Sequence, residues 1–163
     1  METNVEHLVN SIITLENTAE NRKRIENWKP NENTAEAYWH GRPKDKLSYI
    51  PITIEPEHEM WGKIIGFNLG KYYRDGRTYL LADMNMKIYR FENFLDGTPI
   101  GRNVSLWMGA GFEAEMFGVA QKYTDDKDPW LGREPVLKSK AKLDTLKAPD
   151  FYDNRTMEIV HRM

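Results

Sequence analysis

The chain has 163 residues, of which 40% are apolar and 29% charged, and its formal net charge is -2. This balance is typical of a globular domain, and the small net charge excludes a basic field that would attract nucleic acid or an anionic membrane surface. The absence of cysteine excludes disulfides, Cys-ligated zinc and thiol catalysis within the chain. No apolar run is long enough to span a bilayer, and the first apolar residues are spaced as a helical face rather than as a signal peptide. We therefore expect a cytoplasmic protein.

The N-terminal part predicts helices only. Apolar residues recur at helical spacing over residues 5–15, which indicates an amphipathic helix. Asn17 or Thr18 is a suitable N-cap for a second helix over residues 19–28, which Pro30 would end. A short third helix is predicted over residues 35–40. We interpret residues 1–45 as a helical lead-in.

From residue 46 onward the pattern alternates between strands and helices. Ile50, Ile52 and Ile54 alternate with other residues and predict a first strand over 47–54. Pro56 then opens a predicted helix. Four glycines interrupt the segment 62–76 that follows. Residues 78–94 carry the strongest helical stripe. The remaining predicted elements are a second strand at 103–108, a helix at 112–117, a short strand within 119–123, a polar loop at 124–135, a helix at 139–147 and a last helix from 154.

This order predicts an α/β fold with parallel strands. Two or three strands are too few to close a barrel, and the open edges of buried strands need cover. The pattern therefore favours a partner for residues 46–163.

Two segments are candidates for a functional site. Glu55 and His58 come after the first predicted strand, where a histidine among carboxylates could transfer protons; the competing interpretation is a solvated helix N-terminus. Trp107, Met108, Gly109 and Gly111 join the second predicted strand to a helix. They could receive the neutral edge of a large ligand, or the glycines could serve only a tight turn.

No metal site is predicted. The four histidines are dispersed, and Asp125, Asp126 and Asp128 lack the glycine and the closing glutamate of a calcium loop. We interpret these aspartates as part of a solvated loop that Trp130 anchors.

Three phrases in the second half carry a family resemblance. They are KIYRFENF at 87–94, GAGFEAEMFG at 109–118 and LKAPDFYDN at 146–154. Their order and spacing resemble the N-terminal part of the uroporphyrinogen decarboxylase-like superfamily, which includes methyltransferases that serve corrinoid proteins. The resemblance implies that residues 46–163 are the first strands and helices of a TIM-type (β/α) barrel. Such a barrel needs about as many residues again, so the chain would be a truncated form or one subunit of a split enzyme.

The resemblance favours the methyltransferase side of the superfamily. Decarboxylases carry an arginine-rich stretch early, whereas this chain has Glu55, Glu57 and Glu59 after the first predicted strand. The implied function is that of a corrinoid-linked methyltransferase subunit, completed by a homologous or complementary barrel subunit. Corrinoid and zinc would belong to the assembled complex, possible partners include a corrinoid protein, and no zinc ligand can be assigned here. The alternatives are a non-catalytic half-barrel that stabilises or regulates a full-length homologue, and a different lyase or decarboxylase on the same scaffold.

Overall fold

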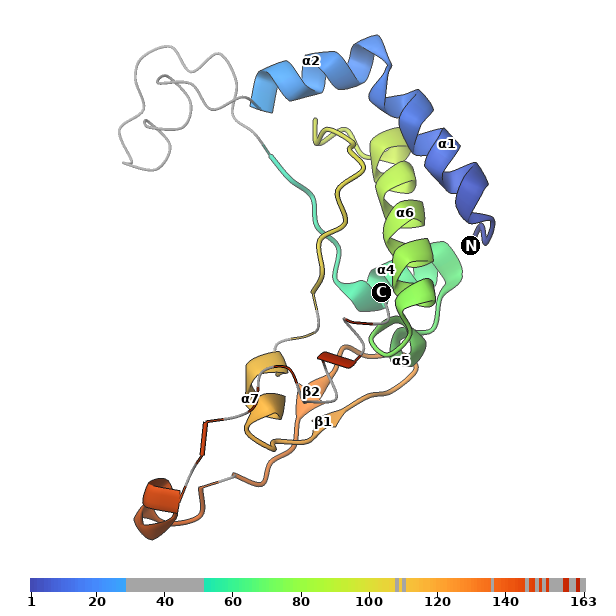
Figure 1. Cartoon of the computed structure of the whole chain (residues 1–163). Helices are drawn as coiled ribbons and strands as arrows, with labels where there is room; N and C mark the ends of the chain where they lie inside the picture. The colour runs from blue at the N-terminus through green and yellow to red at the C-terminus, as the bar shows by residue number, and fades with distance from the viewer. Residues whose placement is uncertain are drawn as a thin grey trace, which may run out of the picture. The chain divides into compact units, whose positions relative to one another are not determined.

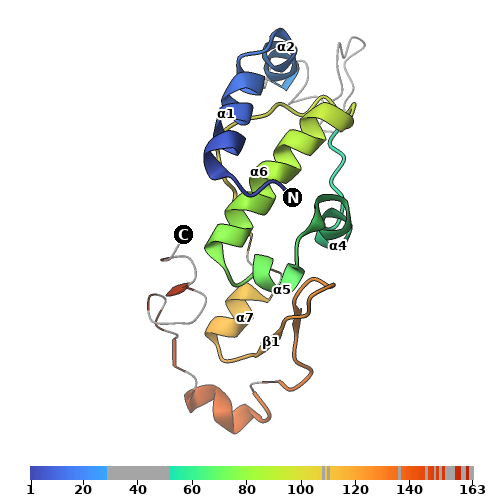
Figure 2. The ribbon, with the colours of Figure 1, turned by 90° about the vertical axis from the view of Figure 1, so that its right-hand side faces the viewer.

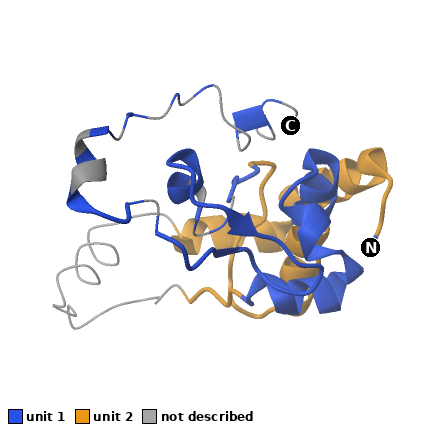
Figure 3. Cartoon of the chain, turned by 90° about the horizontal axis from the view of Figure 1, so that it is seen from below, with its two compact units in different colours: residues 1, 56–83, 104–163 blue, residues 2–55, 84–103 orange. Residues whose placement is uncertain are grey.

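A computed structural model describes residues 1–28, 52–107, 109, 111–135, 137–145, 147, 148, 150, 152, 157, 158 and 161. The chain forms two compact units, which Figure 3 distinguishes by colour. The first unit comprises residues 1, 56–83 and 104–163, and the second comprises residues 2–55 and 84–103. The long helix α6 (Gly76–Asn93) contributes its first part to the first unit and its second part to the second.

The second unit is built on α1 (Val5–Glu16), α2 (Ala19–Trp28) and the later part of α6, beside which α1 runs (Figures 1 and 2). Asn4 caps α1 by accepting a hydrogen bond from the His7 amide at 3.2 Å. The Thr18 hydroxyl accepts one from the Asn21 amide at 3.1 Å, as expected of an N-cap. The two helices predicted from residues 5 and 19 are therefore confirmed. The buried apolar residues of this unit are Leu8, Ile12, Met84, Phe91 and Ile100.

Two buried polar residues of α2 fix the loop after α6. The Asn21 amide group bonds both the N–H (2.9 Å) and the carbonyl (3.1 Å) of Ile100. The Arg24 guanidinium donates to the carbonyls of Thr98 (3.1 Å) and Phe91 (3.2 Å) and lies 4.1 Å from the centre of the Phe91 ring. Because buried polar groups need partners, these bonds allow a polar helix face to pack inward.

The first unit begins with a helix that is broken twice. The elements are α4 (His58–Trp61), the π-helical turn η2 (Gly62–Gly66) and α5 (Leu69–Tyr72), and then the first part of α6. Gly66 has a φ of 83°, in the left-handed region that glycine adopts without strain, and it ends η2. The buried core of this unit consists of Trp61, Phe67, Leu69, Tyr72, Tyr73, Tyr79, Leu81, Ala82 and Met157.

The later part of the first unit contains α7 (Phe112–Met116), β1 (Gln121–Lys122), β2 (Trp130–Leu131) and the 3-10 helix η3 (Lys140–Thr145). The strands pair antiparallel, with Gln121 opposite Leu131 and Lys122 opposite Trp130. The predicted helix at 112–117 and the short strand within 119–123 are present. The segment 124–135, predicted as a loop, supplies the second strand.

The predicted α/β barrel segment is wrong for the described part of the chain, where the sheet has two antiparallel strands and helices predominate. The second predicted strand, at 103–108, forms no strand over its described residues 103–107. Of the first, residues 47–51 lie outside the described residues and residues 52–54 form no strand. A parallel pair needs a crossover of about a dozen residues or more, whereas the short connection between β1 and β2 permits an antiparallel hairpin.

Two further predictions fall on other parts of the chain. The helix at 35–40 and the boundary at residue 45 lie outside the described residues.

Among the helices that are described, none combines the length and the apolar character needed to cross a membrane.

Candidate functional site

His58 lies at the start of α4, within a group of aromatic rings in the first unit. Its imidazole stacks on Trp107 with a centroid distance of 4.9 Å and an interplanar angle of 2°. The rings of Tyr72 and Tyr73 lie 5.4 and 5.8 Å from it. The side chain of His58 is 24% exposed, so the imidazole is held by packing and remains accessible to solvent. The structure thus brings together one predicted catalytic residue and one predicted ligand-binding residue.

A carboxylate lies between His58 and a buried tyrosine. The Tyr73 hydroxyl donates a hydrogen bond of 2.7 Å to Asp128 Oδ1. The same oxygen is 3.8 Å from His58 Nδ1. This distance is too long for a hydrogen bond, but it places a carboxylate beside the imidazole. We call His58, Tyr73, Trp107 and Asp128 the His58 cluster.

The tyrosine hydroxyls of this region act as fixed donors. Burial raises the pKa of Tyr73 far above its usual value, and the hydrogen bond to Asp128 and the charge of that carboxylate raise it further. Burial also raises the pKa of Tyr72. Tyr79 donates to the Ser105 carbonyl at 2.6 Å and accepts from the Trp107 amide at 2.9 Å, so its hydroxyl fixes the backbone that carries the stacked indole.

Sequence reasoning misses Tyr73 and Asp128. The sequence predicts a solvated loop around Asp128, yet its side chain is only 26% exposed and is bonded to Tyr73. Trp130, the predicted anchor of that loop, is 42% exposed in β2. No local spacing marks the members of the cluster as neighbours, because they lie in four separate segments of the chain. The paired tyrosines at the end of α5 are the available signal, since adjacent aromatic residues often belong to a core.

The protein's own side chains pack against the glycine turn before α7. Gly109 and Gly111 are buried, and Gly109 has a φ of 90°. A Cβ placed on Gly111 would lie 2.4 Å from Leu131 Cδ2, and one on Gly109 would lie 3.0 Å from Pro129 Cγ. Pro129 and Leu131 therefore pack closely against this turn, which favours the tight-turn interpretation. Met108 lies outside the described residues.

Glu55, the other predicted catalytic residue, belongs to the second unit. Its carboxylate forms an ion pair of 2.6 Å with Arg90 Nη1, and Arg90 Nε lies 3.0 Å from Asp96 Oδ2. Asp96 also accepts hydrogen bonds of 3.0 Å from the amides of Ile54 and Thr98. Burial acts to raise the pKa of Asp96, but these hydrogen bonds outweigh it and lower the pKa. The arrangement holds the segment before α4 and does not leave Glu55 as a separate base.

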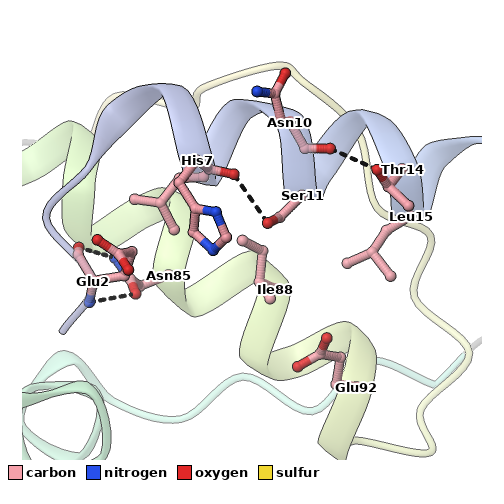
Figure 4. Close-up of a pocket in the computed structure, with 10 residues that line it drawn as sticks. Glu2, His7, Asn10, Ser11, Thr14, Leu15, Asn85, Ile88 and Glu92 are labelled. Atoms are coloured by element: carbon pink, nitrogen blue, oxygen red, sulfur yellow. Dashed lines mark hydrogen bonds between the residues drawn. The ribbon is translucent and has the colours of Figure 1, made fainter.

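The second unit also carries an open groove of about 550 Å³ between α1 and α6 (Figure 4). His7 and Leu15 point toward α6, whereas the Asn10 side chain points away from it. Asn85 closes one end through bonds to the Glu2 amide (3.1 Å) and carbonyl (2.9 Å). The groove mixes apolar and polar side chains, and it contains no arrangement that indicates a reaction.

The described part of the chain assembles no group of metal-binding side chains. Among the described residues, no group of three or more histidine, aspartate or glutamate side chains could hold a metal ion. Pro129 and Leu131 pack closely against the turn expected to receive a flat ligand.

Comparisons with known proteins give no relative for this chain: no family model, curated protein or solved structure matches it.

Proposed function

We propose that the chain is a subunit of an enzyme and that the His58 cluster is its proton-transfer site. The observation that carries this proposal is the imidazole of His58, stacked on Trp107 at 4.9 Å and placed 3.8 Å from a carboxylate oxygen of Asp128. Histidine changes charge near neutral pH, and a nearby carboxylate and a fixed ring plane are the features that position a general acid or base.

In this proposal each member of the cluster has a separate task. His58 is the catalytic residue, since its ring is accessible and can exchange a proton with a bound substrate. Asp128 is a positioning residue whose carboxylate lies beside the imidazole, and Tyr73 fixes that carboxylate by a 2.7 Å hydrogen bond. Trp107 defines the plane of the ring. In the proposed step the neutral imidazole of His58 would accept one proton from the substrate and then release it to solvent.

The family resemblance suggests which reaction the His58 cluster would serve. The phrases at 87–94, 109–118 and 146–154 favour a corrinoid-linked methyltransferase of the uroporphyrinogen decarboxylase-like superfamily, completed by another chain, whereas the barrel that the resemblance also implies is not formed by the described residues. Proton transfer at the methyl acceptor is the step that His58 would serve. In this proposal a corrinoid and zinc would be held in the assembled complex by the complementary chain, and no step here depends on either group. The proposal also includes a cytoplasmic location, which cell fractionation would test.

The test is the activity of the native complex. The protein is purified with its partner, and methyl transfer is measured for the wild type and for His58→Gln, with His7→Gln as the control because His7 lies in the other unit. We expect His58→Gln to lower turnover roughly 10²-fold or more and to remove one limb of the pH profile. Unchanged turnover in His58→Gln would refute the assignment.

A second candidate is a non-catalytic subunit that stabilises or regulates a homologous enzyme. The exposure of large apolar side chains favours this second candidate, because contiguous exposed apolar patches mark interaction surfaces. In the second unit, Ile52, Ile54 and Leu95 are 62%, 49% and 97% exposed. One experiment separates the two candidates. If the chain is a regulatory subunit, the wild type and His58→Gln should have the same effect on the activity or stability of the partner enzyme.

A further inference from the structure

The segment 104–107 of the first unit has the sequence of a strand, and none of the described residues forms a strand beside it. Its residues are Val-Ser-Leu-Trp, which are common in sheets except for the serine. No helix, turn or bend interrupts it, and Figure 1 shows it as an extended trace. Val104 and Leu106 are 41% and 47% exposed. An exposed apolar segment of this kind is a template for pairing with another chain.

One edge of this segment is already used. The Tyr79 hydroxyl contacts both the Ser105 carbonyl and the Trp107 amide. These two groups therefore point to the same side, as residues i and i+2 do in an extended chain. The amides and carbonyls of Val104 and Leu106 consequently point to the opposite side. Within the described part of the chain, no hydrogen bond to these four groups is present.

We propose that this free edge pairs with the same segment of a second copy of the chain, as a two-stranded antiparallel ladder centred on Ser105. The proposal goes beyond the function proposed above. In this register Val104 of one copy faces Leu106 of the other, and each such pair exchanges two hydrogen bonds. The two Ser105 residues face each other as a non-hydrogen-bonded pair.

The segment is self-complementary in three respects. Pairs of Val104 and Leu106 bring apolar side chains together across the strands, which stabilises a sheet. No charged residue occurs between 104 and 107, so two copies do not place like charges opposite each other. An isologous contact of this kind closes as a two-fold dimer and does not propagate into a fibre.

Single-cysteine variants test the register, because the chain has no cysteine of its own. The Cα atoms of facing non-hydrogen-bonded residues lie about 4.5 Å apart, within the range of roughly 4.4–6.8 Å that a disulfide spans. Ser105→Cys should therefore form a disulfide-linked dimer under mild oxidation. In Leu106→Cys the two cysteines would be offset by two positions in the ladder, with their Cα atoms roughly 8 Å apart. This distance exceeds the range of a disulfide, so the variant should stay largely uncrosslinked.

Proline variants test the hydrogen bonds independently by sedimentation. Leu106→Pro removes an amide from the free edge and should convert the dimer to monomer. Ser105→Pro is the matched control, because its amide lies on the edge that faces Tyr79, and it should leave the dimer intact.

Three outcomes would overturn the proposal. The chain could sediment as a monomer at high concentration, both cysteine variants could crosslink equally, or a different polypeptide could bind this edge. None of these outcomes bears on the activity of His58→Gln in the native complex, so the two proposals fail separately.

Discussion

Replacing Asp96 by asparagine removes the central charge of the network that holds the segment before α4. The side chain of Asp96 is 0% exposed and that of Arg90 is 16% exposed, so their 3.0 Å ion pair is shielded from solvent. Asp96 Oδ2 also accepts the Ile54 amide, and Oδ1 accepts the Thr98 amide. Removing one partner of a buried pair costs about 3–5 kcal/mol, because the other charge is left without compensation. Arg90 retains Glu55, which favours the lower figure, about 3 kcal/mol.

The free energy of unfolding of Asp96→Asn is measured by urea titration at neutral pH and fixed protein concentration. The control is Glu55→Gln, which removes the other carboxylate on the same guanidinium. The Glu55 side chain is 64% exposed, so its loss should cost no more than about 1 kcal/mol. Equal effects of the two substitutions, both below about 1 kcal/mol, would refute the reasoning that burial makes Asp96 the main partner of Arg90.

The same network predicts a pH dependence. Because the pKa of Asp96 is lowered in the folded protein, the unfolded chain binds a proton at this residue more readily than the folded chain does. The stability that Asp96 contributes is therefore fully present above the ordinary aspartate pKa of about 3.9 and is lost as the pH falls through the lower folded value. The difference in stability between wild type and Asp96→Asn should shrink below about pH 4.

Three further changes give separate tests of the structure. Tyr73→Phe removes the donor of the 2.7 Å hydrogen bond to Asp128 and should cost about 1.5–3 kcal/mol in urea titration, whereas an unchanged midpoint would argue against this bond. Gly111→Ala places a Cβ 2.4 Å from Leu131 Cδ2 and should destabilise the fold by about 1–3 kcal/mol through overpacking; a stabilised variant would show that the turn has room. Asn4→Ala removes the cap of α1 and should cost about 1 kcal/mol, with a matching loss of helical signal in circular dichroism.

The structure changes one expectation about His58. At a solvated helix N-terminus after a strand, as the sequence suggests, His58→Ala would alter stability by no more than about 0.5 kcal/mol. The imidazole is instead only 24% exposed and is stacked on Trp107, so its removal also deletes ring contacts. A comparison of turnover between variants is therefore cleaner with glutamine, which keeps a polar side chain of similar length.

Local signals in the sequence are sufficient for α1, α2 and most of α6. The helix predicted at 139–147 is instead the 3-10 helix η3. The apolar spacing after Asn4 and the cap at Thr18 predict α1 and α2, because helical hydrogen bonds close within the segment itself. The long helix is predicted from residue 78, and it begins at Gly76 because the Asp75 carboxylate accepts the Thr78 amide at 2.9 Å. Such differences of two residues are expected at helix ends.

The strands and the site depend on tertiary structure. The residues of 104–107 favour a strand, but a strand also needs a neighbouring backbone, and the described chain supplies only the hydroxyl of Tyr79 there. His58 can be named as a candidate from the sequence, yet Trp107 and Asp128 reach it only through the packing of distant segments. Apolar spacing and capping residues are therefore enough to predict α1, α2 and α6 and to name His58 as a candidate for proton transfer. Tertiary structure decided the pairing of β1 with β2 and the surroundings of His58, because both arise from contacts that no local spacing records.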